Sequence, residues 1–189
     1  MRKPKIYLDT SVISNLEKDA LILWEELKTN KFQVIISNIT VAELSKFQEP
    51  KRTAMLEKIT ELEYQIIEEN NESLSLAERY INFGVLKRKC LDNLRHIAVA
   101  SMVDCKYIVS CSFHQLVNIN TIERVQAANK VYGYNDIFIL PPTMIAGGTG
   151  DDIYNIRYTN YEKIRNMTHQ EIFEHTHNEA QYGLEFLKG

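Results

Sequence analysis

The sequence has few cysteines, no long apolar run and no large excess of either charge. Its 3 cysteines, Cys90, Cys105 and Cys111, are odd in number and lack C-x-x-C spacing, so neither a disulfide framework nor a zinc site is predicted. They are expected to be reduced thiols of a cytoplasmic protein. No window approaches about 18 apolar residues. The basic start leads into no apolar h-region, and the sequence predicts neither a signal peptide nor a membrane span.

Charge is unevenly distributed along the chain. Residues 1–140 contain 18 basic and 18 acidic side chains, whereas residues 141–189 contain 4 and 7, which accounts for the net charge of −3. Neither part is basic enough to indicate nucleic-acid binding from charge alone. With 189 residues, of which 44% are apolar, the chain is predicted to be a globular protein that can bury a full core.

Strand and helix patterns alternate through the first 140 residues. Strands are expected at 6–8, 32–36, 64–67, 107–109 and 137–140. Apolar residues at helical spacing predict helices at 16–29, 53–63, 73–83, 90–103 and 121–131, and a short helix that Ser37 or Asn38 can cap and Pro50 ends. This order predicts an α/β fold with a parallel sheet and helices on both of its faces.

A glycine-rich stretch at 146–152 divides the chain into a domain of residues 1–145 and an acidic extension of residues 146–189. It is predicted to be a link, because it lacks the Lys-Ser/Thr pair and the preceding strand of a phosphate loop. Apolar residues from Ile164 to Leu187 predict one or two amphipathic helices in the extension. These are expected to dock on the main domain or on a second copy. The alternatives are a tail that grips a partner or covers the crevice.

Polar residues follow the predicted strands, at the edge where open α/β sheets bind ligands. Asp9 ends the first strand, and Glu43 lies on the flank of the short helix after the second. Taken alone, Glu43 could instead serve the helix macrodipole. At about 100° per residue, Asn93 lies at the rim of its helix's buried stripe, whereas Asp92 lies nearly opposite. Asn93 is therefore expected to face the crevice.

Two further residues lie near this edge. Ser112 follows the predicted strand 107–109. His96 lies on the same side of its helix as Asn93, and a lone histidine is more often a capping or hydrogen-bonding residue than a ligand.

The order of four motifs resembles the PIN domain family, and most closely its VapC-like toxins, over about residues 5–140. The motifs are Leu-Asp-Thr-Ser from Leu8, Ala-Glu-Leu from Ala42, Leu-Arg-His-Ile-Ala-x-Ala from Leu94 and Tyr-Ile-Val-Ser-x-x-Phe from Tyr107. The resemblance implies a three-layer α/β/α domain and an endoribonuclease that depends on Mg²⁺ or Mn²⁺. It also implies a small antitoxin partner and a homodimer.

The resemblance implies a role for each matching residue. Asp9 and Glu43 match the first two acids, and Asn93 stands at the third position, where the family prefers Asp; these three are the implied metal ligands. Ser112 stands at the fourth position and completes the implied catalytic set. Thr10 or Ser11 matches a hydroxyl that orients a metal-bound water.

Asn93 and Ser112 replace two charged positions with neutral groups. Mg²⁺ commonly takes one or two protein carboxylates and keeps several waters, so a site with two acids remains feasible. Binding of a second metal ion, or activation of the attacking water, would be weakened. Two functions therefore stay open: a metal-dependent endoribonuclease, or a weak or inactive PIN-like module that binds RNA or a protein partner.

Basic residues near the predicted helix at 90–103 are candidates for contact with RNA phosphates. These residues are Lys87, Arg88 and Arg95. The alternative is a solvated run of charge with no ligand. Thr10 and Ser11 are further candidates for substrate contact.

Overall fold

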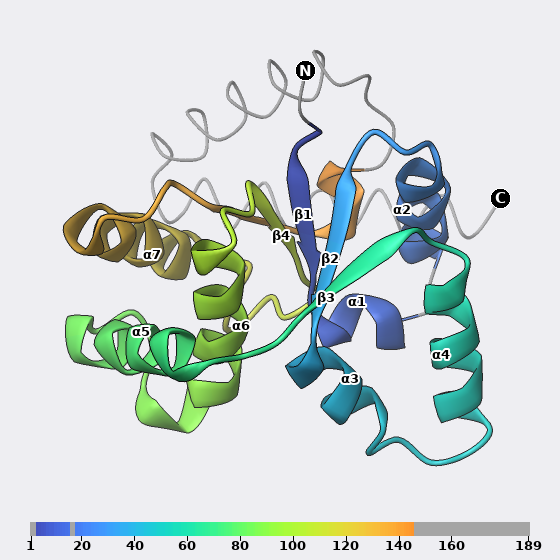
Figure 1. The fold of residues 1–189 in the computed structure, drawn as a ribbon, viewed down its shortest axis with the longest axis horizontal. Helices are drawn as coiled ribbons and strands as arrows, with labels where there is room; N and C mark the ends of the chain where they lie inside the picture. The colour runs from blue at the N-terminus through green and yellow to red at the C-terminus, as the bar shows by residue number, and fades with distance from the viewer. Residues whose placement is uncertain (1–2, 16–17, 146–189) are drawn as a thin grey trace, which may run out of the picture. The chain divides into compact units, whose positions relative to one another are not determined.

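The computed structural model describes residues 3–15 and 18–145. Within them, a five-stranded sheet has the strand order β3-β2-β1-β4-β5 (Figure 1). Every neighbouring pair is parallel. The strands are β1 (Lys5–Leu8), β2 (Gln33–Ser37), β3 (Tyr64–Ile67), β4 (Tyr107–Val109) and β5 (Phe138–Leu140).

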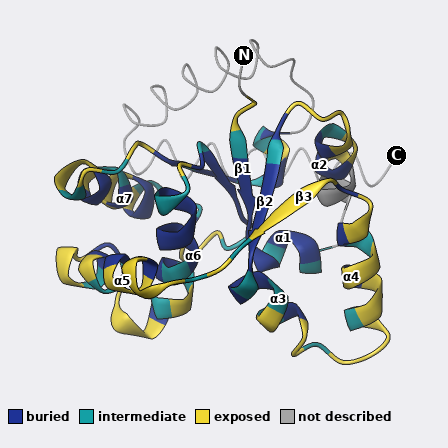
Figure 2. Ribbon diagram, in the orientation of Figure 1, coloured by how far each residue is buried: buried dark blue, intermediate teal, exposed yellow. Residues whose placement is uncertain are grey.

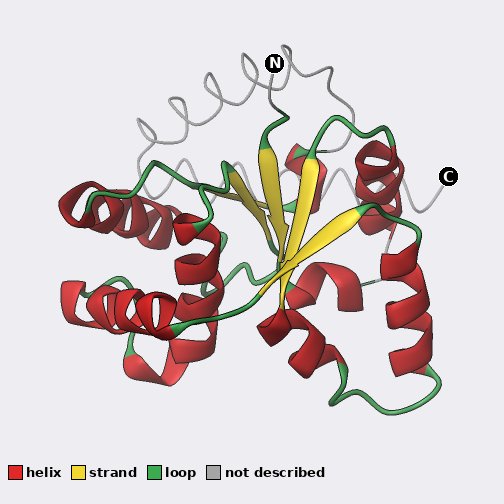
Figure 3. Ribbon diagram, viewed as in Figure 1, coloured by secondary structure: helices red, strands yellow, loops and turns green. Residues whose placement is uncertain are grey.

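Helices cover both faces of the sheet. They are α1 (Thr10–Ser14), α2 (Lys18–Lys28), α3 (Asn38–Leu44), α4 (Lys51–Thr60), α5 (Asn71–Phe83), α6 (Leu91–Met102) and α7 (Ile119–Tyr132), with 3₁₀ turns η1 (Arg88–Cys90) and η2 (Pro142–Met144). Figure 3 shows α5, α6 and α7 on one side of the strands and α1 to α4 on the other. The predicted α/β/α arrangement with a central parallel sheet is therefore confirmed.

The central strands are buried on both faces, as the continuous apolar runs of a parallel sheet require. Ile6 and Leu8 point into a core shared with Trp24 of α2 and Met55 of α4. Tyr7 points to the opposite face and is fully buried. The edge strand β3 is largely exposed (Figure 2). No helix in the described part of the chain is long and apolar enough to cross a membrane.

One short helix was not predicted from the sequence. α1 begins directly after Asp9, and its residues Val12 and Ile13 are buried. Its β-branched residues have modest helix propensity, so packing against the core holds this turn where local preference does not. The predicted extension at 146–189 lies outside the described residues, and the division into two parts stays a prediction.

Candidate active site

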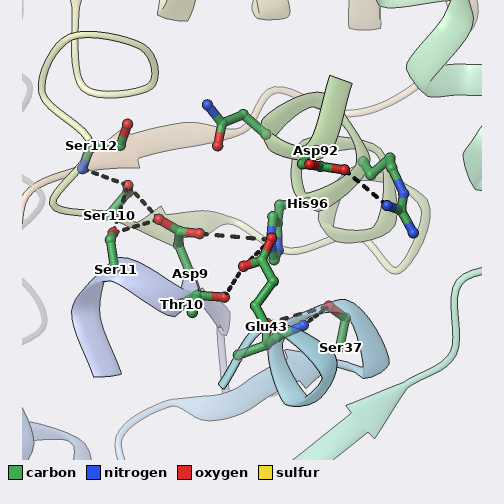
Figure 4. Close-up of polar contacts among 12 residues, drawn as sticks. Asp9, Thr10, Ser11, Ser37, Glu43, Asp92, His96, Ser110 and Ser112 are labelled. Carbon is green, nitrogen blue, oxygen red and sulfur yellow. Dashed lines mark hydrogen bonds and ion pairs between the residues drawn. The ribbon is translucent and has the colours of Figure 1, made fainter. Parts of the chain in front are cut away.

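Asp9 lies at the C-terminal end of β1 and is 4% exposed. Its Oδ2 accepts hydrogen bonds from Ser11 Oγ at 2.5 Å and from Ser110 Oγ at 2.8 Å. A buried carboxylate needs such donors, because desolvation without hydrogen bonds is costly. The two hydroxyls fix one oxygen of Asp9, while Oδ1 faces His96 (Figure 4).

Glu43 reaches the same place from α3. Ser37 caps this helix by accepting a hydrogen bond from the Thr40 N–H, and Glu43 follows in its second turn. Glu43 Oε2 accepts a hydrogen bond from Thr10 Oγ1 and lies 3.2 Å from His96 Nε2. The sequence-based placement of Asp9 and Glu43 at one edge of the sheet thus agrees with the structure.

The ionisation of Glu43 follows from these contacts. Partial burial by itself would raise the pKa of Glu43, but the hydrogen bonds from His96 and Thr10 outweigh it, with smaller electrostatic contributions from His96 and Lys46. The net result is a pKa below the ordinary carboxyl value. Glu43 is therefore an anion at neutral pH and accepts hydrogen bonds only.

His96 lies between the two carboxylates and is 1% exposed. Its Nε2 is 3.2 Å from Glu43 Oε2 and 3.9 Å from Asp9 Oδ1. Its Nδ1 is 2.6 Å from the Tyr7 hydroxyl, which in turn lies 2.6 Å from Ser37 Oγ. Sequence reasoning favoured a hydrogen-bonding histidine here but did not identify its partners.

Ser110 is a site residue that sequence reasoning missed. It is fully buried and donates to Asp9, and its Oγ also accepts the Ser112 N–H at 3.0 Å. The sheet register pairs Leu8 with Val109, so the next residues of the two strands, Asp9 and Ser110, are neighbours. Its position directly after a buried strand, like that of Asp9, was the sequence feature that could have identified Ser110 as a site residue. Ser112 supports Ser110 through its backbone, and its predicted catalytic role stays a prediction.

Asn93 and Asp92 differ in exposure as the helical geometry predicted. Asn93 is half-buried and donates to Gln115 Oε1. Asp92 is exposed and accepts a hydrogen bond from Arg95 at 3.0 Å. The predicted role of Asn93 as a metal ligand stays a prediction: its Oδ1 is the atom that would bind a cation, and its amide nitrogen donates to Gln115.

The two candidate arginines are already paired with carboxylates. Arg95 forms a two-point ion pair with Glu69 at 2.7 and 2.6 Å, and this pair raises the pKa of Arg95. Arg88 forms a similar pair with Glu78 at 3.0 and 2.7 Å. An RNA phosphate would have to compete with these partners. Lys87 is exposed.

The oxygen atoms at this site are donors of the kind that hard divalent cations prefer. In the described residues there is no group of three or more His, Cys, Asp or Glu side chains that could hold a metal ion. The pair Asp9 and Glu43, surrounded by hydroxyls, supplies the one or two carboxylates through which Mg²⁺ is usually held alongside its waters.

The lowered pKa of Glu43 predicts an acid-sensitive contribution to stability. A depressed carboxyl pKa stabilises the folded state above the unfolded-state pKa, and this contribution is lost as the pH falls through the folded-state pKa. In the metal-free protein, Glu43→Gln is expected to lower the urea midpoint at neutral pH, and the difference from the wild type should shrink below about pH 4.5. Glu57→Gln, on the exposed side of α4, is the control. A Glu43→Gln deficit that is unchanged at low pH would contradict the prediction.

No protein-family model matches the chain, and no curated protein matches it. Among solved structures, the chain is similar to a chain in the crystal structure of VapBC2 from Rickettsia felis bound to a DNA fragment from their promoter. The two are 18% identical, the TM-score is 0.47, and the match covers 72% of this chain and 98% of the other.

Proposed function

We propose that this protein is a PIN-type endoribonuclease that depends on a divalent cation and hydrolyses RNA phosphodiesters at Asp9 and Glu43. One observation carries the proposal: the two carboxylates, one directly after β1 and one from α3, lie 3.9 and 3.2 Å from His96 Nε2. They meet at the C-terminal edge of a parallel sheet, where α/β folds bind ligands. The resemblance of the motifs to PIN domains supports the same assignment.

The surrounding groups orient both acids. Ser11 and Ser110 hold Oδ2 of Asp9 and leave Oδ1 for a ligand. Thr10 holds Oε2 of Glu43 and leaves Oε1. The carboxylates would hold Mg²⁺ or Mn²⁺, which when bound neutralises phosphate charge and lowers the pKa of water. Asn93 would be a third ligand through its Oδ1, and Ser112 would orient a water or a phosphate oxygen.

An RNA cleavage assay tests the proposal. The full chain is incubated with several RNAs in Mg²⁺, in Mn²⁺ and with a chelator, beside Asp9→Asn. We expect cleavage with either cation, and its loss in the variant and with the chelator. Cleavage no greater than that of Asp9→Asn, across all RNAs and both cations, would refute the proposal.

A module that binds RNA or a protein without cleaving it is the second candidate. The observation that favours it is the missing negative charge: the neutral Asn93 stands at a position where PIN domains prefer an acid. Calorimetry separates the two candidates, because the binding-only module has no Mn²⁺ site in the millimolar range. A measurable site that Asp9→Asn abolishes would exclude it.

The proposed function also implies a cellular location and protein partners. A toxin of this type would act in the cytoplasm, form a homodimer and be neutralised by a small antitoxin. Light scattering of the purified chain tests the dimer. Capture of a small protein encoded beside this chain, followed by loss of RNA cleavage, tests the antitoxin.

A further inference from the structure

A directed chain of hydrogen bonds passes through His96. Ser37 Oγ lies 2.6 Å from the Tyr7 hydroxyl, and this hydroxyl lies 2.6 Å from His96 Nδ1. On the other side of the ring, Nε2 lies 3.2 Å from Glu43 Oε2. Tyr7 and His96 are both buried to 1% exposure or less. This hydrogen-bond chain joins the N-cap of α3 to its second turn through two side chains from other elements.

We propose that His96 is a positioning residue that donates its Nε2 proton to Glu43, so that the site holds its cation through oxygen atoms alone. This inference rests on the proposed function, because it concerns the same metal site. It assigns His96 a role as a donor, not as a metal ligand.

The direction of each bond follows from what each atom can do. An ionised carboxylate only accepts, so Nε2 must carry the proton that points at Glu43. A neutral imidazole then has a bare Nδ1, which needs a donor. The Tyr7 hydroxyl supplies it, and burial, which raises the pKa of Tyr7, keeps that proton in place. Ser37 completes the chain by donating to Tyr7 while its own oxygen accepts the Thr40 N–H.

This arrangement affects the choice of metal. A histidine binds a metal through a nitrogen lone pair, and the Nε2 lone pair is used by its proton here. Because the imidazole of His96 is then not a metal ligand, the remaining ligand atoms are oxygens, which suit Mg²⁺ and Mn²⁺ rather than Zn²⁺. Outer groups that orient a metal ligand typically change metal affinity by about 10- to 100-fold when they are removed.

Nitrogen NMR of the metal-free chain tests the proton position directly. The chain has 5 histidines, and the His96 signals are identified by their absence from His96→Gln. In buffer above about pH 8, where an ordinary imidazole is neutral, we expect a protonated Nε2 and a bare, hydrogen-bonded Nδ1. An unprotonated Nε2 would overturn the proposal, and a protonated Nδ1 would overturn the direction assigned to the Tyr7 bond.

Two amide variants test the positioning role. The amide nitrogen of His96→Gln reaches about as far as Nε2, whereas that of His96→Asn, one methylene shorter, stays near Nδ1. We expect Mn²⁺ affinity, measured by calorimetry, to fall at most a few-fold in His96→Gln and about 10- to 100-fold in His96→Asn. Equal losses in both variants would mean that His96 only fills space.

Tyr7→Phe and Tyr80→Phe form a matched pair of variants that tests the hydrogen bond from Tyr7 to His96. Both hydroxyls are fully buried and hydrogen-bonded, Tyr80 to Ser101 and Asn129 in the layer of α5, α6 and α7. Tyr7→Phe is expected to shift the Nδ1 resonance of His96, and Tyr80→Phe to leave it unchanged. An unshifted resonance in Tyr7→Phe would show that Tyr7 does not donate to this ring.

The two proposals can fail separately. If the wild-type chain binds no Mn²⁺ and cleaves no RNA, the proposed function fails, but the NMR experiment still reports the proton on Nε2. If the protein binds Mn²⁺ and cleaves RNA but Nε2 lacks its proton, the proposed function stands and the donor role of His96 fails.

Discussion

Replacing Asn93 by aspartate is expected to raise the affinity for Mg²⁺ and Mn²⁺ by about 10-fold or more, because it adds a negative charge close to the cation, and to raise the rate of any RNA cleavage with it. Asn93 lies one turn before His96 on the same side of α6, so a carboxylate there would lie beside Asp9 and Glu43. Hard cations prefer charged oxygens. Gln115 can rotate its amide and donate to the new carboxylate in place of accepting from Asn93. Calorimetry and a cleavage assay measure the two effects.

Asp92→Asn is the matched control for this gain. It removes one negative charge at the adjacent position, where the side chain is 73% exposed and paired with Arg95. Cation affinity is expected to change by less than about twofold, since exposed charges are screened by solvent. If Asn93→Asp raises neither the cation affinity nor the cleavage rate, this position does not face the metal. An already strong nuclease activity that Asn93→Asp leaves unchanged would make the binding-only function untenable.

Replacing Arg95 by alanine is expected to lower the free energy of unfolding by about 2–3 kcal/mol. Arg95 holds Glu69 at two points, and the Glu69 side chain is only 10% exposed. Without the guanidinium, a largely buried carboxylate loses its cation. Glu69 also donates its backbone N–H to Asn38 at the start of α3, so this pair links α6 to the helix that carries Glu43. Urea unfolding measures the loss.

Arg88→Ala is the control for Arg95→Ala. The Arg88–Glu78 pair has similar two-point geometry, but its side chains are 65% and 44% exposed. An exposed pair contributes little to stability, because water and salt screen it. RNA affinity is expected to stay within about twofold of the wild type in Arg95→Ala. A large loss of RNA affinity without a loss of stability would instead assign Arg95 to the substrate.

Much of the fold follows from local sequence pattern. The run at Ile6–Leu8 and the run at Tyr107–Val109 predict buried strands, and both are observed. Helix ends were also predictable: Gly133 follows α7 with φ of 80°, a left-handed conformation that glycine adopts without strain. Helix α1, which was not predicted, is too short to show a helical spacing of apolar residues.

The candidate site was only partly predictable. Asp9 and Glu43 follow strands that pair in parallel, so topology alone brings them to one edge. The link from Tyr7 to His96 joins residues 89 positions apart, and no periodicity carries such information. The partner of Arg95 was equally hidden from the sequence. A positive residue near the site suggested a phosphate contact, whereas the fold supplies Glu69 as its partner.

The pairing of Leu8 with Val109 has a consequence for how the length of this chain can change. Side chains alternate between faces along a strand, so one residue inserted into β1 or β4 would turn Asp9 or Ser110 to the other side of the sheet. Insertions around Gly84, between α5 and η1, would leave that pairing intact. Insertions and deletions in related chains are therefore expected to gather in such surface connections and to spare the few residues that precede Asp9 and Ser110.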